Sequence, residues 1–308
     1  MMINTTTQPR VALVILIWNG MEDTLECLRS LETDTYPNKE IFIVDNGSTD
    51  DSVREIGRLF PDVIILETGA NLGFTGGNNF GVRHALERKC DYVFLLNNDT
   101  TVEPDALGKL VAAAESQPDY GILAPVIHYY DEPRDVWFAN SILELHRGAA
   151  WHDNSGGEPG LNQAPYEVPW ATGCAMLIRT KRMSDMGGFD DRYYLSWEDV
   201  DLSLRMRKAG LSVVVVPASR IYHKGGRSGQ RMPESKYYYT VRNSLLLVRK
   251  HLQGLSRLSA AMRIVAASLL QCRRVYNSEP GEVFRYMRTT FEGIMDHLTG
   301  RYGAFRVK

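Results

Sequence analysis

Short apolar runs that stop abruptly at polar residues recur through the N-terminal third of this chain. They lie at 11–17, 40–44, 63–66 and 92–96. Each run has the length of a buried β-strand, and polar turns and helix-forming segments separate them. Strands that alternate with helices favour right-handed crossovers and a mainly parallel sheet covered on both faces. The sequence therefore predicts an α/β fold whose functional groups gather at the carboxyl ends of the strands.

The run at 92–96 continues into Asn97, Asn98 and Asp99, so a carboxylate follows closely on a strand that should be buried. Mg²⁺ and Mn²⁺ prefer such oxygen ligands and are usually held by one or two carboxylates together with substrate phosphates. Asp99 is the predicted metal ligand, and the neutral Asn97 and Asn98 are expected to orient ligands or a sugar. The alternative is that Asp99 caps the turn that follows it.

Two later segments contain groups suited to a metal-bound diphosphate. His223 follows a predicted strand and precedes two glycines, and Lys224 and Arg227 beside it are suitable counter-ions for phosphate. Glu198 and Asp199 lie at the expected start of a helix, where one carboxylate could act as a general base. The local pattern leaves two alternatives open, a loop histidine without a ligand and acids that only stabilise the positive helix end.

The glycine-rich stretch at 73–81 does not match the Gly-x-Gly-x-x-Gly fingerprint, and it follows the third strand and not the first. An enzyme that uses a nicotinamide cofactor is therefore disfavoured. We interpret the stretch as part of a connection into a helix at 82–88. Asp45 ends the second strand, which is the usual position of an acid that receives a ribose hydroxyl or a base edge.

The formal net charge of −2 hides a strong asymmetry. Residues 227–308 contain 15 Lys or Arg against 5 Asp or Glu, which leaves 20 against 32 in residues 1–226. This basic region is expected to be helical, with Leu258, Met262 and Leu269 on one apolar stripe. Its partner could be an anionic membrane surface, an anionic substrate or an acidic face of the same fold. A merely solvated surface and packing on the catalytic domain are the alternatives.

No segment approaches the roughly 18 uninterrupted apolar residues of a spanning helix, and the first residues lack a signal-peptide pattern. We therefore expect a cytoplasmic protein, located at the inner face of the cytoplasmic membrane if the basic region contacts it. The four cysteines are scattered without metal-site spacing and should be reduced. We expect no nucleic-acid partner.

Several motifs occur together and in one order, and with them the chain resembles the family 2 inverting glycosyltransferases of the GT-A fold, especially their rhamnosyltransferase-like branch. The resemblance covers roughly residues 10–250 and rests on Ile17-Trp18-Asn19-Gly20, Val44 to Asp50, Asn71-Leu72-Gly73-Phe74, Gly76 to Asn79, Leu96 to Asp99, Gly187-Gly188-Phe189-Asp190 and Trp197 to Leu202. It implies a Rossmann-like nucleotide-diphospho-sugar transferase domain at 1–228. The nucleotide-binding half would span about 10–100, the acceptor half about 101–228, and a basic helical region would follow at 229–308.

The resemblance also implies roles for individual residues. Asp99 stands where the family places its metal ligand, with Asn97 in place of the usual first acid, and His223 matches a position that helps to bind metal or diphosphate. Asp199 matches the catalytic base and ranks ahead of Glu198. The remaining implied contacts are Lys224 and Arg227 for the diphosphate; Trp18, Asn19, Asp45, Ser48, Asn71, Gly73, Asn79, Asn97 and Asn98 for the nucleotide; and Gly173, Asp190 and Trp197 for the acceptor.

The implied reaction is a single in-line displacement with inversion, dependent on Mg²⁺ or Mn²⁺. A sugar, with L-rhamnose from dTDP-L-rhamnose favoured, would move to a hydroxyl of a glycan acceptor, preferably polyprenyl-linked, in bacterial cell-surface polysaccharide synthesis. The loop at 153–160 would border the acceptor. A UDP-hexose-dependent transferase of the same fold and a catalytically degenerate glycan-binding protein are the alternatives. A sugar-phosphate nucleotidyltransferase is disfavoured, because Trp18-Asn19-Gly20 after the first strand contains no Lys or Arg.

Overall fold

The centre of the fold is a mixed, mainly parallel sheet. The computed structural model describes residues 8–225, 233–278 and 280–306. The sheet contains β1 (Val11–Ile17), β2 (Lys39–Asp45), β3 (Ile64–Glu67), β4 (Tyr92–Asn97), β5 (Thr100–Val102), β6 (Tyr120–Tyr129), β7 (Val136–Phe138), β10 (Tyr166–Glu167), β11 (Ala175–Arg179) and β12 (Ser212–His223). Its order is β10-β12-β6-β11-β4-β1-β2-β3, with β5 beside β12 and β7 beside β6. A separate hairpin consists of β8 (Ser141–Glu144) and β9 (Ala149–His152).

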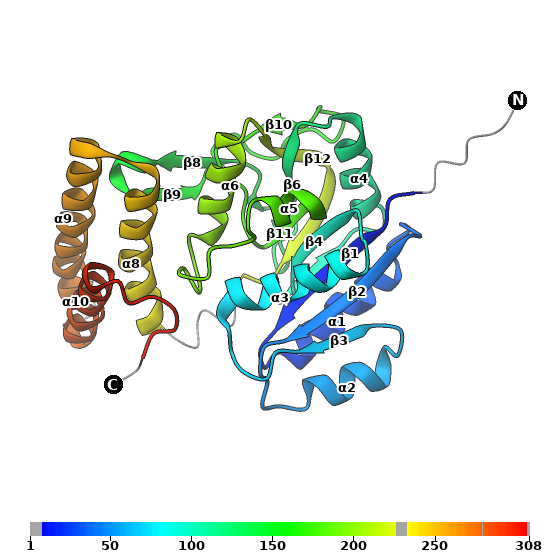
Figure 1. Cartoon of the computed structure of the whole chain (residues 1–308), viewed down its shortest axis with the longest axis horizontal. Helices are drawn as coiled ribbons and strands as arrows, with labels where there is room; N and C mark the ends of the chain where they lie inside the picture. The colour runs from blue at the N-terminus through cyan, green and yellow to red at the C-terminus, as the bar shows by residue number, and fades with distance from the viewer. Residues whose placement is uncertain (1–7, 226–232, 279, 307–308) are drawn as a thin grey trace, which may run out of the picture.

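Helices cover the sheet, and a group of C-terminal helices lies at one end of it (Figure 1). The helices around the sheet are α1 (Met21–Glu32), α2 (Ser52–Leu59), α3 (Gly73–Glu87), α4 (Ala106–Ser116), α5 (Thr180–Asp185) and α6 (Glu198–Lys208). The C-terminal group consists of α8 (Pro233–His251), α9 (Gly254–Ser278) and α10 (Val283–Thr299). Short 3₁₀ turns occur at η1 (Leu145–Arg147) and η2 (Pro280–Glu282). The predicted α/β fold with a helical extension is confirmed.

The four apolar runs form adjacent strands whose carboxyl ends meet. β1 pairs in parallel with β2 and with β4, so that Ile17 lies opposite Asp45 and Leu16 lies opposite Asn97. The residues of β1 from Val11 to Ile15 are fully buried, which explains why this strand is uninterruptedly apolar. The polar residues that follow these strands therefore gather along one edge of the sheet.

The glycine-rich stretch is helical, and its interpretation as a connection was wrong. Helix α3 begins at Gly73 and includes the segment up to Gly81. A Cβ atom at Gly77 would lie 2.3 Å from Cδ1 of Leu16, and one at Gly81 would lie 2.4 Å from Cγ1 of Val14. The glycines let the helix approach β1 closely. Their low helix propensity, about 1 kcal/mol each relative to Ala, is outweighed by this packing.

The region from 131 to 169 has more order than its composition indicates, since β7 to β10 lie within it. Strand β12 is longer than its β-branched run at 213–216 indicates. It pairs with β6 along its length, and its register shifts between Val216 and Arg220, which is a bulge that lets the strand continue to His223. His223 is thus the last residue of a strand rather than part of the loop after it.

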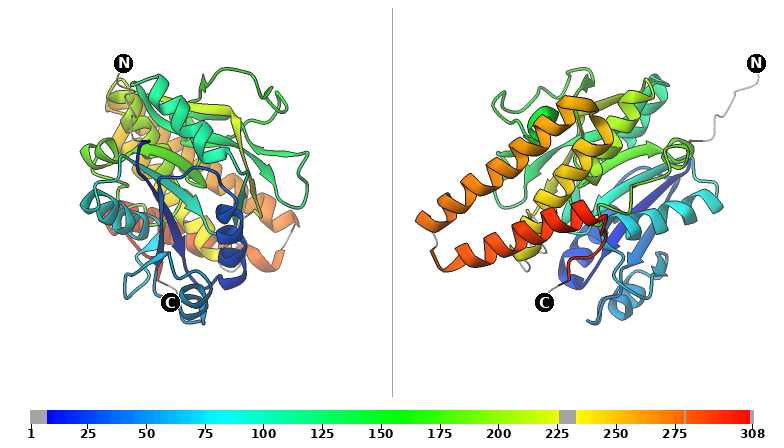
Figure 2. Two further views of the ribbon diagram at one scale, coloured as in Figure 1. Left: turned by 90° about the vertical axis from the view of Figure 1, so that its right-hand side faces the viewer. Right: turned by 60° about the vertical axis from the view of Figure 1, so that its left-hand side comes forward.

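The C-terminal helices pack on one another and on the α/β layer formed by the sheet and its covering helices. Figure 2 shows α9 and α10 as a pair that extends away from the sheet, with α8 between them and the α/β layer. None of the helices in the described residues combines the length and apolar character that crossing a bilayer requires. The four cysteines are free, as expected.

Gly81→Ala should destabilise the fold. The new methyl group would collide with Val14 and with Val44, whose Cγ2 would lie 2.9 Å away, and both belong to the rigid sheet. We expect a loss of about 1–3 kcal/mol in the free energy of unfolding, measured by chemical denaturation. Gly108→Ala in α4 is the control, because its Cβ would have only Tyr36 nearby, at 3.9 Å. The control should be neutral or gain up to about 1 kcal/mol. Equal stability of both variants would contradict the packing role.

Candidate active site

Asp99 and His223 meet at the carboxyl edge of the sheet. Strands β5 and β12 pair antiparallel with His223 opposite Thr100, and the backbone N–H of Lys224 donates to the carbonyl of Asp99 at 3.0 Å. Nε2 of His223 lies 3.1 Å from Oδ1 of Asp99, and both residues are buried. Helix α4 begins only at Ala106, with Asp105 as its N-cap residue. The structure therefore brings together the two residues predicted as metal ligands.

His223 is enclosed by an aromatic ring and by two groups that favour its protonated form. Its ring packs edge-on against Trp137 with the centroids 4.4 Å apart, and neither ring nitrogen has an aligned hydrogen-bond partner within the described part of the chain. Burial opposes a charged imidazole, but Cys174 and Asp99 outweigh this effect and raise the pKa of His223 to about 10. The protonated ring therefore pairs with the Asp99 carboxylate. A divalent cation held by these two side chains would take the place of that proton, because only a neutral imidazole ligates metal.

A carboxylate and an imidazole are donors that suit Mn²⁺ or Mg²⁺, so the residues fit the metal that the fold implies. No group of three or more His, Cys, Asp or Glu side chains is gathered for a metal anywhere in the described ranges. A small protein ligand set is typical of a cation that shares its shell with substrate phosphates. Asn98 does not join the pair, because its Nδ2 donates to Oγ1 of Thr24 at 3.0 Å.

The loops after β1 and β2 are joined by hydrogen bonds. The backbone N–H of Asn19 donates to Oγ of Ser48 at 3.0 Å, and Oδ1 of Asn19 accepts from the N–H of Thr49 at 2.7 Å. The carboxylate of Asp45 accepts from the N–H of Ser48 at 3.1 Å. Trp18 lies beside them with 38% of its surface exposed. Trp18, Asn19, Asp45 and Ser48, all predicted to contact the nucleotide, thus lie on one continuous rim with an exposed aromatic ring.

The turn into α3 is fixed by asparagines. Oδ1 of Asn71 accepts from Nδ2 of Asn46 at 3.1 Å, from the N–H of Gly73 at 2.9 Å and from the hydroxyl of Tyr194 at 3.0 Å. Gly73 has a φ of +73°, and a Cβ there would lie 2.5 Å from the carbonyl oxygen of Tyr194. The nucleotide-side turn therefore touches the loop that precedes α6.

Asn79 is directed toward a different part of the fold than the other residues predicted to contact the nucleotide. Its Nδ2 donates to the carbonyl of Phe189 at 2.9 Å and to Oδ1 of Asp191 at 2.8 Å. Its Oδ1 accepts from the N–H of Phe189 at 2.9 Å. The amide thus ties α3 to the Gly187–Asp190 turn, and this contact explains its place in the motif.

Glu198 and Asp199 form the first turn of α6, and their carboxylates have different environments. Asp199 accepts from the backbone N–H of Gly173 at 3.0 Å and from that of Val200 at 2.8 Å. Glu198 is buried, and its Oε2 has no hydrogen-bond partner among the residues that the structure describes. Burial raises the pKa of both carboxyl groups, and the neighbouring Asp199 charge adds to the rise for Glu198, whose pKa lies well above the usual range.

The loop before this pair has an unusual backbone. Tyr194, Ser196 and Trp197 have φ values of 64°, 69° and 74°, although none is glycine. Such conformations cost of order 1–3 kcal/mol each and persist only where the surroundings fix them. Trp197, predicted to contact the acceptor, is the N-cap residue of α6 in this conformation.

Helix α8 supplies the groups that fix this loop. Nδ2 of Asn243 lies within hydrogen-bond distance of three loop carbonyls, those of Tyr193, Leu195 and Ser196, at 2.8–3.0 Å. Arg242 is fully buried, and its Nη2 donates to the carbonyl of Tyr193 at 2.7 Å. The two side chains hold a strained backbone immediately before the candidate catalytic residues.

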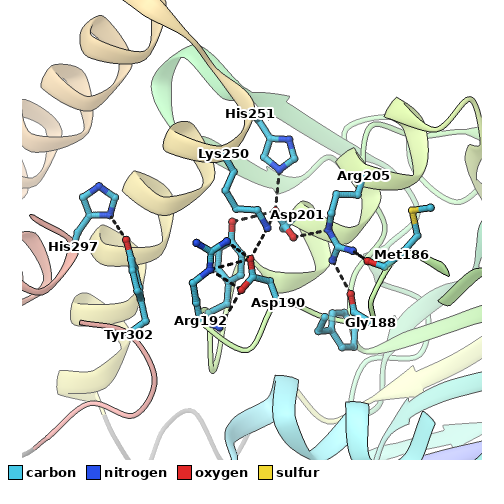
Figure 3. Close-up of polar contacts among 12 residues, drawn as sticks. Met186, Gly188, Asp190, Arg192, Asp201, Arg205, Lys250, His251, His297 and Tyr302 are labelled. Carbon is cyan, nitrogen blue, oxygen red and sulfur yellow. Dashed lines mark hydrogen bonds and ion pairs between the residues drawn. The ribbon is translucent and has the colours of Figure 1, made fainter. Parts of the chain in front are cut away.

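A network of charges adds to this connection (Figure 3). Lys250 of α8 lies 2.6 Å from Asp190 and 2.7 Å from Asp201, and Arg192 also pairs with Asp190, at 2.7 Å. Asp201 is fully buried and accepts from Arg205 at 2.8 Å. Burial opposes the charge of Asp190, but Arg192 and Lys250 outweigh it and hold the pKa of that carboxyl well below its usual value. Asp190, predicted to contact the acceptor, is thus engaged with two cations.

The predicted diphosphate contacts are only partly described. Lys224 lies beside the site but pairs with Asp23 at 2.7 Å and with Glu26 at 2.5 Å. Arg227 lies outside the described residues. The loop at 153–160 follows β9, whose His152 packs on Trp137 with the centroids 4.5 Å apart, and Glu158 in the loop pairs with Arg220 of β12. Trp137 thus connects this segment with His223.

Known proteins resemble the chain in sequence and in fold. A family model described as glycosyl transferase family 2 matches residues 12–186. The chain is 31% identical over 228 residues to an N-acetylglucosaminyl-diphospho-decaprenol L-rhamnosyltransferase of Mycobacterium tuberculosis, over 68% of this chain and 74% of that protein. It is 22% identical over 296 residues to the dTDP-rhamnosyl transferase RfbF of Shigella flexneri, over 92% of this chain and 94% of that protein. The mannosyltransferase PcManGT of Pyrobaculum calidifontis, solved with GDP-Man and Mn²⁺, matches with a TM-score of 0.58 at 15% identity, over 96% of this chain and 89% of that chain.

Asn243→Asp should loosen the loop before Glu198. The substitution replaces the amide donors by a carboxylate that would face the carbonyls of Tyr193, Leu195 and Ser196. We expect a loss of about 2–4 kcal/mol in the free energy of unfolding, together with faster amide hydrogen exchange across residues 190–199. Thr240→Ala, at an exposed position of the same helix, should change stability by less than about 0.5 kcal/mol. Unchanged exchange in the Asn243→Asp protein would show that α8 does not hold the loop.

Proposed function

The chain belongs to glycosyl transferase family 2, and on this premise we propose that it transfers L-rhamnose from dTDP-L-rhamnose to a hydroxyl of a polyprenyl-linked glycan acceptor. The observation that carries the proposal is the buried pair Asp99–His223 at the same sheet edge as the nucleotide rim. The names of two relatives support the donor and the acceptor, because one acts on a diphospho-decaprenol glycan and the other is a dTDP-rhamnosyl transferase. Such a reaction serves bacterial cell-surface polysaccharide synthesis at the cytoplasmic face of the membrane.

In the proposed site each residue has one task. Trp18, Asn19, Asp45 and Ser48 would hold the nucleoside, together with the Asn71–Gly73 turn and Asn97. Asp99 and His223 would hold Mg²⁺ or Mn²⁺, which when bound supplies positive charge next to the diphosphate. Arg227 remains a proposed contact of the diphosphate. Lys224 is proposed for the same role, and its ammonium group also pairs with Asp23 and Glu26. Gly173 and Trp197 would face the acceptor.

The acidic pair Glu198–Asp199 contains the proposed general base. The acceptor hydroxyl would lose its proton to Asp199 as its oxygen attacks the anomeric carbon, and the nucleoside diphosphate departs from the opposite face, so that configuration inverts. Asp199 suits this task because two backbone N–H groups stabilise its ionised form and fix its orientation. Glu198 is the poorer base, since burial and the adjacent Asp199 charge raise its pKa and disfavour its ionised form. Two carboxyl groups with separated pKa values thus have different roles.

Two substitutions separate binding from chemistry. Asp99→Asn should weaken Mn²⁺-dependent binding of dTDP-rhamnose, measured calorimetrically, by about tenfold or more, because the amide is a poorer metal ligand. Asp199→Asn should bind the donor normally but lose about 10²–10⁴ in kcat, the usual contribution of a general base. Asp185→Asn, at an exposed position of α5, is the control.

The same titrations with UDP-hexoses test the donor. Preference for a UDP-sugar would exclude the rhamnose donor but keep the transferase. Failure of every nucleoside diphosphate sugar to bind, even at millimolar concentration, would contradict the whole proposal and favour a degenerate glycan-binding protein.

The rate should also depend on pH in a defined direction. Burial raises the pKa of Asp199, and the base must be ionised to accept a proton. The value of kcat should therefore fall about tenfold per pH unit below this raised pKa, and the fall should begin at a higher pH than it would for an exposed aspartate. The pH profile of kcat in the wild-type protein provides the measurement. A rate that stays constant down to the pKa of an ordinary carboxylate would contradict the assignment.

A further inference from the structure

Helix α10 presents an apolar stripe on its outer side. Phe284, Met287, Phe291, Met295 and Leu298 are spaced by three and four residues, which places them on one face of the helix. Phe284 is 77% exposed, Phe291 63% and Leu298 70%. Single exposed apolar residues are common on soluble proteins, but a continuous stripe of this kind marks an interaction surface.

The opposite face of α10 is already used for packing. Tyr286, Thr289, Thr290 and Gly293 are buried, and a Cβ atom at Gly293 would lie 2.9 Å from the carbonyl oxygen of Tyr238 in α8. The helix therefore cannot turn its outer stripe inward without losing this close contact. The stripe remains exposed to the surroundings as a fixed feature of the fold.

Helix α9 has the same division into an inner and an outer face. Ala260, Ile264 and Ser268 are buried, and Ile264 packs against Gly148 at the turn between η1 and β9. The outer side carries exposed apolar residues, with Leu255 84% exposed and Leu270 65% exposed. The others are Leu258, Met262 and Leu269. We call the exposed apolar residues of α9 and α10 together the outer apolar surface.

The charges around this surface indicate its partner. Residues 254–306 contain eight Arg and four Asp or Glu. Arg257, Arg263 and Arg273 are exposed on α9. A symmetric contact with a second copy would bring two arginine-rich faces together, which like-charge repulsion disfavours. An anionic lipid surface suits both the exposed apolar residues and the arginines. It accepts apolar side chains at the acyl boundary and attracts arginine at the headgroups.

We propose that the outer apolar surface lies on an anionic membrane, with α9 and α10 parallel to the plane of the bilayer. Both helices extend from the α/β layer as one pair (Figure 2). Helix α8 ties that pair to the loop before Glu198 through Asn243, and Lys250 of the same helix pairs with Asp190 and Asp201 (Figure 3). Attachment through α9 and α10 would therefore hold the active site close to the membrane. The exposed apolar residues and the charges support membrane binding independently of the reaction. The role of this binding in the reaction rests on the proposed lipid-linked acceptor.

The test is flotation of the full-length protein with vesicles that contain phosphatidylglycerol, compared with vesicles of pure phosphatidylcholine. We expect binding to the anionic vesicles that weakens as salt rises. The double variant Phe284→Gln/Phe291→Gln should bind about tenfold or more weakly, because two large rings no longer enter the interface. Leu59→Gln/Leu161→Gln, at positions 40% and 47% exposed outside these helices, is the matched control and should bind like the wild-type protein.

Two further measurements separate this inference from the proposed function. Transfer to a soluble acceptor analogue should be unchanged in the Phe284→Gln/Phe291→Gln protein, because neither residue belongs to the active site. Loss of vesicle binding with intact soluble transfer supports the surface, whatever the donor is. Equal flotation of wild-type and double variant would overturn the inference. So would a wild-type protein that ignores vesicles and forms a dimer that the double variant loses, as measured by light scattering.

Discussion

The pairing of β12 with β5 is the contact on which the candidate site depends. It fixes His223 opposite Thr100 and so brings an imidazole to 3.1 Å from the carboxylate of Asp99, a residue distant in the sequence. The bulge between Val216 and Arg220 lets β12 reach that point while it still pairs with β6. Without this register the two donors would lie in separate loops, and the nucleotide rim formed after β1 and β2 would have no cation site beside it.

The second half of the site depends on a different kind of contact. Glu198 and Asp199 follow a loop that contains three non-glycine residues with positive φ, and buried polar side chains of α8 hold that loop. Asn243 and Arg242 satisfy its carbonyls, while Lys250 compensates the charge of Asp201 in the interior. The C-terminal helices thus hold the loop before the candidate catalytic pair and also form the outer apolar surface. The basic residues of this region fall into two groups. Those of α8 include Lys250, which pairs with the buried Asp201, and those of α9 include exposed arginines.

The strands could be predicted from the sequence because the pattern that marks them is local, and the candidate site residues could be named for the same reason, while their roles remain predictions. The sequence shows the apolar runs of strand length and the polar residues that end them. It also shows Asp99, His223 and the acidic pair Glu198–Asp199 as candidates beside such strands or at a helix start. The start of α3 at Gly73 could not be predicted, because glycine disfavours helices in isolation and only packing on Val14 and Leu16 reverses that preference. Arg242 and Asn243 gave no signal beyond a basic helix, since their role depends on a distant loop. The engagement of Asn79 with Phe189 is likewise a tertiary contact.

The central claim is that a divalent cation and a nucleoside diphosphate meet at Asp99 and His223. The most direct measurement is a crystal structure of the protein with Mn²⁺ and dTDP, with anomalous diffraction used to locate manganese. The account predicts an anomalous peak within coordination distance of an Asp99 carboxylate oxygen and of the His223 ring, with diphosphate oxygens completing its shell. A nucleotide bound at the rim after β1 and β2 with manganese elsewhere, or with no manganese at all, would contradict it.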